Sequence, residues 1–168
     1  KPRRSSSGQD LYVYHTLGDS GYFVDIGAHN GKDGSNTYAL EQAGWKGVCV
    51  EASPVHREEL RKNRNCIVDG SLIYGEKTRK KFFIHSHCKV HEEFKEFERQ
   101  QKNKELINIH SFLGGGGIVD HLDEDHKDKM EGSYTELETV TLLDLLKKHK
   151  SPKTIDFLDI DVEGSEYE

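Results

Sequence analysis

Residues 23–31 read FVDIGAHNG. A short apolar run carries one acid, Asp25, and the glycines Gly27 and Gly31 follow it directly. Glycine allows positive φ angles and lets the backbone come close to a bound ligand. The segment therefore predicts a buried strand and a tight turn, with a nucleotide-like ligand lying over the turn.

The spacing of the glycines distinguishes between nucleotide cofactors. A dinucleotide fingerprint, G-x-G-x-x-G, would need glycines where His29 and Lys32 stand. The observed pattern D-x-G-x-x-x-G suits S-adenosylmethionine, which has no pyrophosphate but carries a positive sulfonium and an ammonium group. The acid would stabilise that charge or organise the turn, and an ordinary glycine-rich turn is the alternative. The cofactor-binding candidates in this segment are Asp25, Gly27, Ala28 and Gly31.

A second acid follows the next apolar run. Residues 47–50 read GVCV, and Glu51 comes directly after them. A carboxylate at the end of this strand can accept hydrogen bonds from both ribose hydroxyls, because its two oxygens match a vicinal diol. Alternatively, Glu51 is only a charge ahead of the helix that Ser53 and Pro54 begin. Asp69, after the third strand, is a candidate for the adenine side of the cofactor.

Short apolar strands alternate with helices along the chain, which predicts an α/β fold with a mostly parallel sheet. The predicted strands cover residues 22–26, 47–50, 66–68, 80–84 and 154–160, with 80–84 antiparallel or at an edge. The predicted helices cover residues 37–43, 54–64 and 141–149. Thr141 and Asp144 have the spacing of a capping box at the start of the last helix.

The domain organisation is simple apart from one insert. We expect residues 1–10 to be a flexible tail and residues 11–168 to form one domain. A polar insert interrupts the domain at about residues 85–133, and order is predicted to resume at Thr139. Long loops inside compact domains are often functional, so we expect the insert to serve as an acceptor lid or a partner surface.

Seven segments together resemble the FkbM family of class I methyltransferases. They are residues 10–13 (DLYV), 21–28 (GYFVDIGA), 35–37 (SNT), 44–47 (GWKG), 50–52 (VEA), 141–146 (TLLDLL) and 155–166 (IDFLDIDVEGSE). The last is the most specific, since its D-V-E-G-x-E ending is unusual among methyltransferases at large. The resemblance covers most of the chain except the polar insert. It implies a Rossmann-like sheet, S-adenosylmethionine as the methyl donor and, typically, methylation of a hydroxyl on a sugar or natural product.

The resemblance also implies that further strands follow the fourth one in this family. The sheet is therefore expected to be incomplete after its fourth strand, and a protein partner is one way to cover the open edge after residue 160. Alternatively, the chain is a fragment of a longer one, or the domain has lost activity and serves structurally.

Carboxylates just beyond the fourth strand are candidates for catalysis. Ligands of open α/β sheets bind outside the carboxyl ends of the strands. Methyl transfer to a hydroxyl needs alignment of donor and acceptor and a group that accepts the hydroxyl proton. Asp161 is the first candidate for this proton acceptor and Glu163 is the second. Glu166 is a more remote candidate. The alternative is that Asp161 and Glu163 only cap or orient the following turn.

Composition excludes several classes of protein. The 168 residues carry a net charge of −6, which argues against a general nucleic-acid binder. No apolar run is long enough to span a membrane, and no signal peptide is visible. Three cysteines without CxxC spacing favour a reducing compartment, such as the cytoplasm or an organelle interior. Because the chain begins with Lys, its localisation stays open.

The histidines invite a metal-binding interpretation. His85, His87 and His91 have H-x-H-x-x-x-H spacing, and acidic residues and further histidines follow at 120–126. These residues fall in the polar insert and match no known ligand signature, so we expect solvated histidines and no metal.

Two classes of function follow from these observations. The first is an S-adenosylmethionine-dependent methyltransferase that methylates a hydroxyl of a carbohydrate or small natural product. The second is a non-catalytic methyltransferase-like domain that acts as a structural or interaction subunit of a larger assembly.

Overall fold

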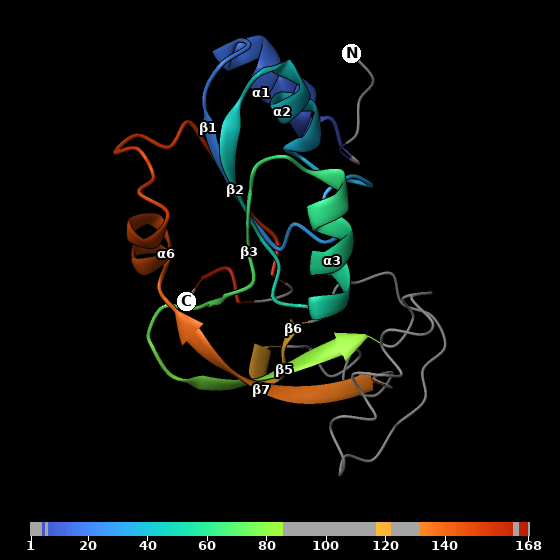
Figure 1. Cartoon of the computed structure of the whole chain (residues 1–168), viewed down its shortest axis with the longest axis vertical. Helices are drawn as coiled ribbons and strands as arrows, with labels where there is room; N and C mark the ends of the chain where they lie inside the picture. Colours follow the sequence, from blue (N-terminus) through green and yellow to red (C-terminus); the bar gives the residue numbers. More distant parts are fainter. Residues whose placement is uncertain (1–4, 6, 86–116, 122–131, 163–164, 168) are drawn as a thin grey trace.

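A computed structural model describes residues 5, 7–85, 117–121, 132–162 and 165–167 (Figure 1). The helices are α1 (Gln9–Leu17), α2 (Tyr38–Ala43), α3 (Pro54–Asn63), α6 (Leu142–Lys148) and the 3-10 turn η1 (Val119–His121). The strands are β1 (Tyr22–Ile26), β2 (Lys46–Val50), β3 (Ile67–Asp69), β4 (Leu72–Ile73), β5 (Arg79–His85), β6 (Gly117–Ile118), β7 (Gly132–Val140) and β8 (Phe157–Ile160).

The first sheet has four parallel strands in the order β3-β2-β1-β8. β1 and β2 are almost entirely buried, as expected for parallel strands covered on both faces. This arrangement confirms the predicted α/β fold and its mostly parallel, Rossmann-like sheet. Because the carboxyl ends of all four strands point the same way, the residues after β1, β2 and β8 meet at one edge.

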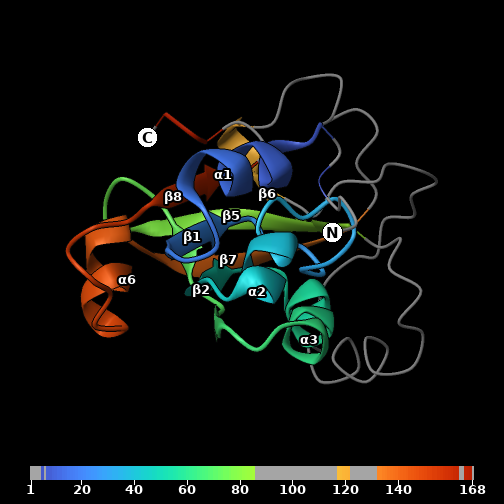
Figure 2. The ribbon, with the colours of Figure 1, turned by 90° about the horizontal axis from the view of Figure 1, so that it is seen from above.

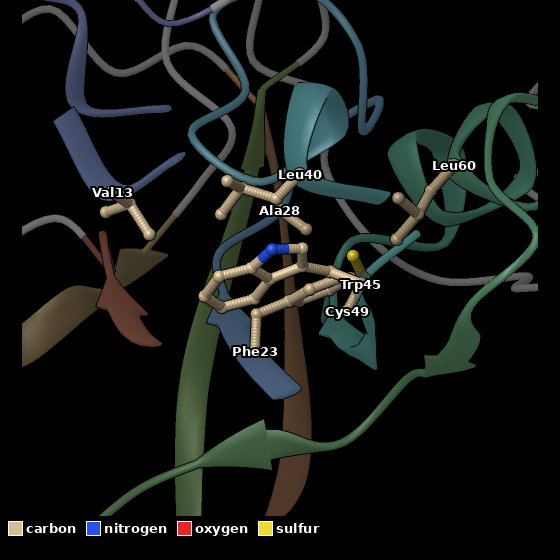
Figure 3. Packing of buried hydrophobic residues seen from close by; sticks show 7 residues of the cluster. All are labelled: Val13, Phe23, Ala28, Leu40, Trp45, Cys49 and Leu60. Atoms are coloured by element: carbon tan, nitrogen blue, oxygen red, sulfur yellow. The ribbon is translucent and has the colours of Figure 1, made fainter. Parts of the chain in front are cut away.

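Alternate residues of the strands pack on opposite faces of this sheet. Helices α1, α2 and α3 cover one face, where Phe23, Trp45 and Leu60 belong to one buried cluster (Figure 3). Helix α6 lies on the other side, where Leu145 packs with Val24 and further strand residues (Figure 1). The period-2 alternation of strand side chains thus explains both apolar layers.

Local sequence signals place the helix starts. Ser53 is the N-cap of α3 and Pro54 is its first residue, as predicted. Thr141 caps α6, where its hydroxyl oxygen accepts a hydrogen bond from the Asp144 backbone N–H at 3.2 Å. The sequence therefore predicted both helix starts correctly.

A second four-stranded sheet was not predicted as a unit. Its order is β4-β7-β5-β6, and β5 pairs antiparallel with β7 and with β6. Residues 80–84 were predicted to form a strand that is antiparallel or at an edge; β5 is antiparallel to both of its neighbours and lies inside the sheet. The expectation that order resumes at Thr139 was wrong, because β7 begins at Gly132. Figures 1 and 2 show β5 and β7 lying across the carboxyl ends of the first sheet.

The N-terminal boundary also differs from the prediction. Helix α1 begins at Gln9, so the last two residues assigned to the tail belong to it. Asp10 is fully buried, and its carboxylate accepts a hydrogen bond from the Ser5 hydroxyl at 2.8 Å. A buried, paired acid holds this segment against the domain.

Strand β8 has a neighbour on one side only among the described residues. It pairs with β1, and its side chains Leu158 and Ile160 are 44% and 38% exposed. That a partner covers this edge stays a prediction. Most of the expected insert, residues 86–116 and 122–131, lies outside the described residues. Within the described part, no helix has the length and apolar character needed to cross a membrane.

Candidate functional site

The turn from Gly27 to Gly31, called the glycine turn below, lies between the ends of β1, β2 and β8. The backbone N–H groups of Gly27 and Ala28 donate to the Val50 carbonyl at 2.9 and 3.0 Å. Gly27 has φ +86°, and a Cβ built on it would stand 1.8 Å from the Asp161 carbonyl oxygen. Gly27 is therefore required by the backbone that follows β8 as well as by its own positive φ.

The other end of the turn rests on helix α3. Gly31 has φ +73°, and a Cβ there would stand 2.2 Å from Leu60 Cδ1. The Asn63 side-chain amide donates to the Asn30 carbonyl at 2.8 Å, and Arg64 Nη1 donates to the Gly31 carbonyl at 3.1 Å. Two consecutive residues at the end of α3 thus bind two consecutive carbonyls of the turn.

Glu51 links the turn to the start of α3. Its Oε2 accepts a hydrogen bond from the His29 backbone N–H at 2.9 Å, and its Oε1 accepts one from the Ser53 backbone N–H at 2.7 Å. The residue is 5% exposed, and burial raises its pKa from 4.5 to about 7. Each oxygen still has a lone pair without a partner in these two hydrogen bonds.

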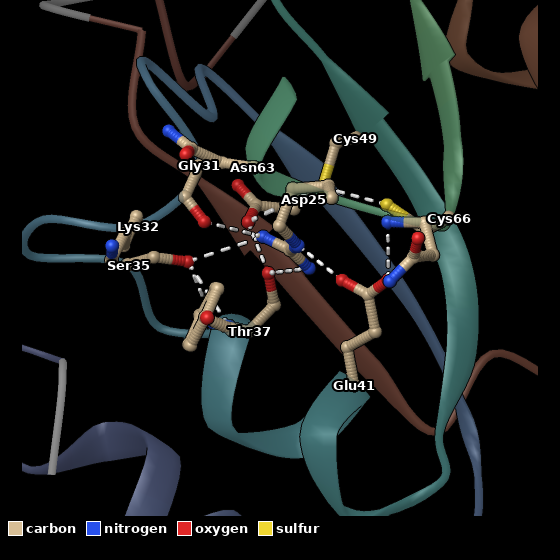
Figure 4. A network of polar contacts seen from close by, with 12 residues as sticks. Asp25, Gly31, Lys32, Ser35, Thr37, Glu41, Cys49, Asn63 and Cys66 are labelled. Atoms are coloured by element: carbon tan, nitrogen blue, oxygen red, sulfur yellow. Dashed lines mark hydrogen bonds and ion pairs between the residues drawn. The ribbon is translucent and has the colours of Figure 1, made fainter. Parts of the chain in front are cut away.

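Asp25 is a buried acid on β1, just before the glycine turn. The register pairs it with Cys49 on β2 and with Asp159 on β8. The Thr37 hydroxyl donates to its carboxylate in a very short hydrogen bond (Figure 4). Burial raises the pKa of Asp25 to about 6, and the neighbouring Asp159 carboxylate acts in the same direction. Burial likewise raises the pKa of Asp159, whose carboxylate accepts a hydrogen bond from Asn36 at 2.9 Å.

These groups surround one cavity of about 490 Å³ between the two sheets. The first sheet and its turns supply one wall, which contains the candidates Asp25, Gly27, Ala28, Glu51 and Asp161. The second sheet supplies an apolar wall of Leu72, Ile73, Phe82 and Ile118. The cavity is large enough for a nucleoside-sized ligand.

The remaining predicted residues lie elsewhere. Gly31 is packed against Leu60 and Arg64 and does not line the cavity. Asp69 does not line it either, because its carboxylate binds Lys148 Nζ at 2.7 Å and His149 Nε2 at 2.6 Å. Although burial opposes ionisation, these hydrogen bonds hold the pKa of Asp69 well below its usual range. Glu163 lies outside the described residues.

Several site residues were missed by sequence reasoning. His29 has φ +50°, lines the cavity and packs against His56, with 3.9 Å between the ring centroids and 38° between the ring planes. Asp159 lies beside Asp25 only because β8 pairs with β1. The apolar wall comes from strands whose pairing is long-range. The alternation of β8 could have placed Asp159 on one face of its strand, but nothing local identified its neighbour.

No group of three or more His, Cys, Asp or Glu side chains suited to a metal occurs among the described residues. His87 and His91 of the predicted H-x-H-x-x-x-H pattern lie outside that part of the chain, so the expectation of solvated histidines stays a prediction.

Cys49 and Cys66 are free thiols with sulfurs 3.4 Å apart.

Comparison with known proteins supports the assignment that these motifs indicate. No curated protein and no solved structure matches the chain significantly. A family model described as the methyltransferase FkbM domain matches residues 25–168, which include the glycine turn, Glu51 and the β8 segment. The chain therefore belongs to the FkbM methyltransferase family.

Proposed function

We propose that the cavity binds S-adenosylmethionine and that the chain transfers its methyl group to a hydroxyl of a sugar or small natural product. The observation that carries the proposal is Glu51, a buried carboxylate that faces the cavity beside the glycine turn. Its two backbone hydrogen bonds fix its orientation, and the second lone pair on each oxygen suits the two hydroxyls of a ribose.

The charge of the cavity supports a cationic ligand. Its lining includes five carboxylates, and none of the described lining residues is a Lys or Arg. The lining carboxylates are Asp25, Asp33, Glu51, Asp159 and Asp161. A dinucleotide pyrophosphate would be repelled here, whereas a sulfonium and an ammonium group would be stabilised. The apolar wall from the second sheet suits a flat purine ring.

When bound, S-adenosylmethionine would supply a methyl carbon that its sulfonium makes electrophilic. The residues of the chain would orient the reactants and accept the proton of the acceptor hydroxyl. Asp161 lines the cavity, is exposed and follows β8 directly, and it is the carboxylate to which we assign this proton. Glu163 is proposed as the second candidate on its position in the chain alone.

The test is calorimetric titration of S-adenosylhomocysteine into the folded chain at pH 8, where Glu51 is ionised. We expect a Kd in the micromolar range for the wild type and a loss of about tenfold or more for Glu51→Gln, since an amide offers one acceptor oxygen instead of two. Asp69→Asn is the matched control, because that buried acid ends the neighbouring strand but does not line the cavity.

A folded wild-type chain that does not bind S-adenosylhomocysteine would overturn the proposal. Equal weakening by Glu51→Gln and Asp69→Asn would also refute the assignment of Glu51. If the product binds but no labelled methyl group reaches any hydroxyl acceptor of a carbohydrate panel, the non-catalytic alternative is favoured.

A further inference from the structure

Arg64 is a buried cation wrapped by the loop that follows the glycine turn. It ends α3, and its side chain has no exposed surface. Its guanidinium donates to the Gly31 carbonyl at 3.1 Å, to Ser35 Oγ at 3.4 Å and to Thr37 Oγ1 at 3.0 Å (Figure 4). It also forms a very short ion pair with Glu41 of α2.

These contacts determine which way the Thr37 hydroxyl points. A guanidinium only donates hydrogen bonds, so Thr37 Oγ1 must act as an acceptor towards Arg64. The single hydroxyl proton is then directed to the second partner of Thr37, the Asp25 carboxylate. Arg64 thus acts on Asp25 through a donor chain inside the fold, where hydrogen bonds polarise one another.

Arg64 also opposes the other charges around Asp25. The groups that act most on Asp25 are the Thr37 hydroxyl, the Asp159 and Asp161 carboxylates and the Arg64 guanidinium. The Glu51 carboxylate on the neighbouring strand also interacts with Asp25. Cys49 adds a weak thiol contact at 3.9 Å. The two carboxylates disfavour the ionised form of Asp25, whereas the guanidinium and the hydroxyl favour it.

We propose that Arg64 is a positioning residue of the cofactor site: it holds the glycine turn in shape and, through the Thr37 hydroxyl, stabilises the Asp25 carboxylate. The proposal rests on the proposed function in so far as the turn and Asp25 serve S-adenosylmethionine. A cation that merely joined α2 to α3 would need its contact with Glu41 only. Three of its four partners instead belong to the loop between β1 and α2.

The first arm of the test follows the titration of Asp25 by carbon-13 NMR in the ligand-free chain, with Asp25→Asn to identify its signal. Glu41→Gln leaves the guanidinium without its counter-charge, so the midpoint of Asp25 should move to lower pH. The double variant Arg64→Met with Glu41→Gln removes the ion pair as a unit, so neither partner of that pair is left as an unpaired buried charge. Its Asp25 midpoint should move to higher pH.

Opposite shifts in these two variants are specific for the electrostatic role. A purely structural contact would leave the midpoint unchanged or move it the same way in both. Either of those results would overturn the proposal. Amide spectra of each variant establish that it is folded. Arg64→Lys keeps the charge but cannot reproduce the contact with Thr37, so its Asp25 midpoint should lie between that of the wild type and that of the double variant.

The second arm measures S-adenosylhomocysteine binding by Arg64→Lys at pH 8, above the pKa of about 6 that Asp25 has in the wild type. A lysine ammonium group cannot reproduce the planar set of hydrogen bonds that the guanidinium donates to Gly31, Ser35 and Thr37. We expect about tenfold weaker binding, equivalent to about 1.4 kcal/mol. Wild-type affinity in this variant would overturn the role in holding the turn. If the wild type itself does not bind, the proposed function fails, whereas the titration of Asp25 still decides the coupling to Arg64.

Discussion

Replacing Glu51 with Gln should change how stability depends on pH, in a defined direction. Burial raises the pKa of Glu51 from 4.5 to about 7. The folded chain therefore keeps this proton to a higher pH than the unfolded chain does. As the pH rises from about 4.5 to about 7, the wild type loses free energy of unfolding, because the unfolded chain releases the proton first. Glutamine does not titrate, so the variant is spared this loss.

The magnitude follows from the two pKa values. One pKa unit corresponds to about 1.36 kcal/mol, so the difference between 4.5 and about 7 corresponds to about 3 kcal/mol. At low pH the variant should be the less stable chain by about 1–2 kcal/mol, because its amide N–H₂ faces one of the two backbone N–H donors. At pH 8 the order should be reversed.

The assay is urea unfolding of wild type and variant at intervals from pH 5 to pH 8. The difference in free energy of unfolding between the two chains should change steadily in favour of Glu51→Gln. Asp69→Asn is the control, and its free energy of unfolding relative to the wild type should have the opposite sign at pH 8. Ion pairs depress the pKa of Asp69, so its charge stabilises the fold throughout this range and the control should be less stable at every pH. A difference for Glu51→Gln that does not vary with pH would refute the reasoning.

Three further substitutions test the glycine turn, the start of α6 and the proposed proton acceptor. Gly27→Ala should destabilise the chain by about 2 kcal/mol or more in thermal unfolding, because its Cβ would overlap the Asp161 carbonyl; a wild-type melting temperature would contradict this. Thr141→Ala should cost about 1 kcal/mol, since it removes the cap of α6, and an unchanged urea midpoint would show that another group replaces it. Asp161→Asn should bind S-adenosylhomocysteine like the wild type but lose methyl transfer, measured with a labelled methyl group; unimpaired transfer would exclude it as the proton acceptor.

The local elements and three of the acids that line the cavity, Asp25, Glu51 and Asp161, could be predicted from the chain. Apolar runs identified β1 and β2, and the glycines with positive φ identified the turn. Ser53 with Pro54 and Thr141 identified two helix starts. Each of these signals depends on neighbours within a few residues, because backbone angles, capping and strand alternation are local properties. Glu51 could be placed at the cavity because parallel strands end at one edge.

The partners of these residues depended on long-range packing. Asp69 carries the same signal as Glu51, an acid at the end of a parallel strand, yet its carboxylate is held by Lys148 and His149 near the end of α6. Asp159 lies beside Asp25, and Arg64 reaches Thr37, only through strand pairing and helix packing. The second sheet likewise joins β4, β5 and β7 from separate parts of the chain. Such contacts arise from the burial of whole faces, which no local pattern specifies.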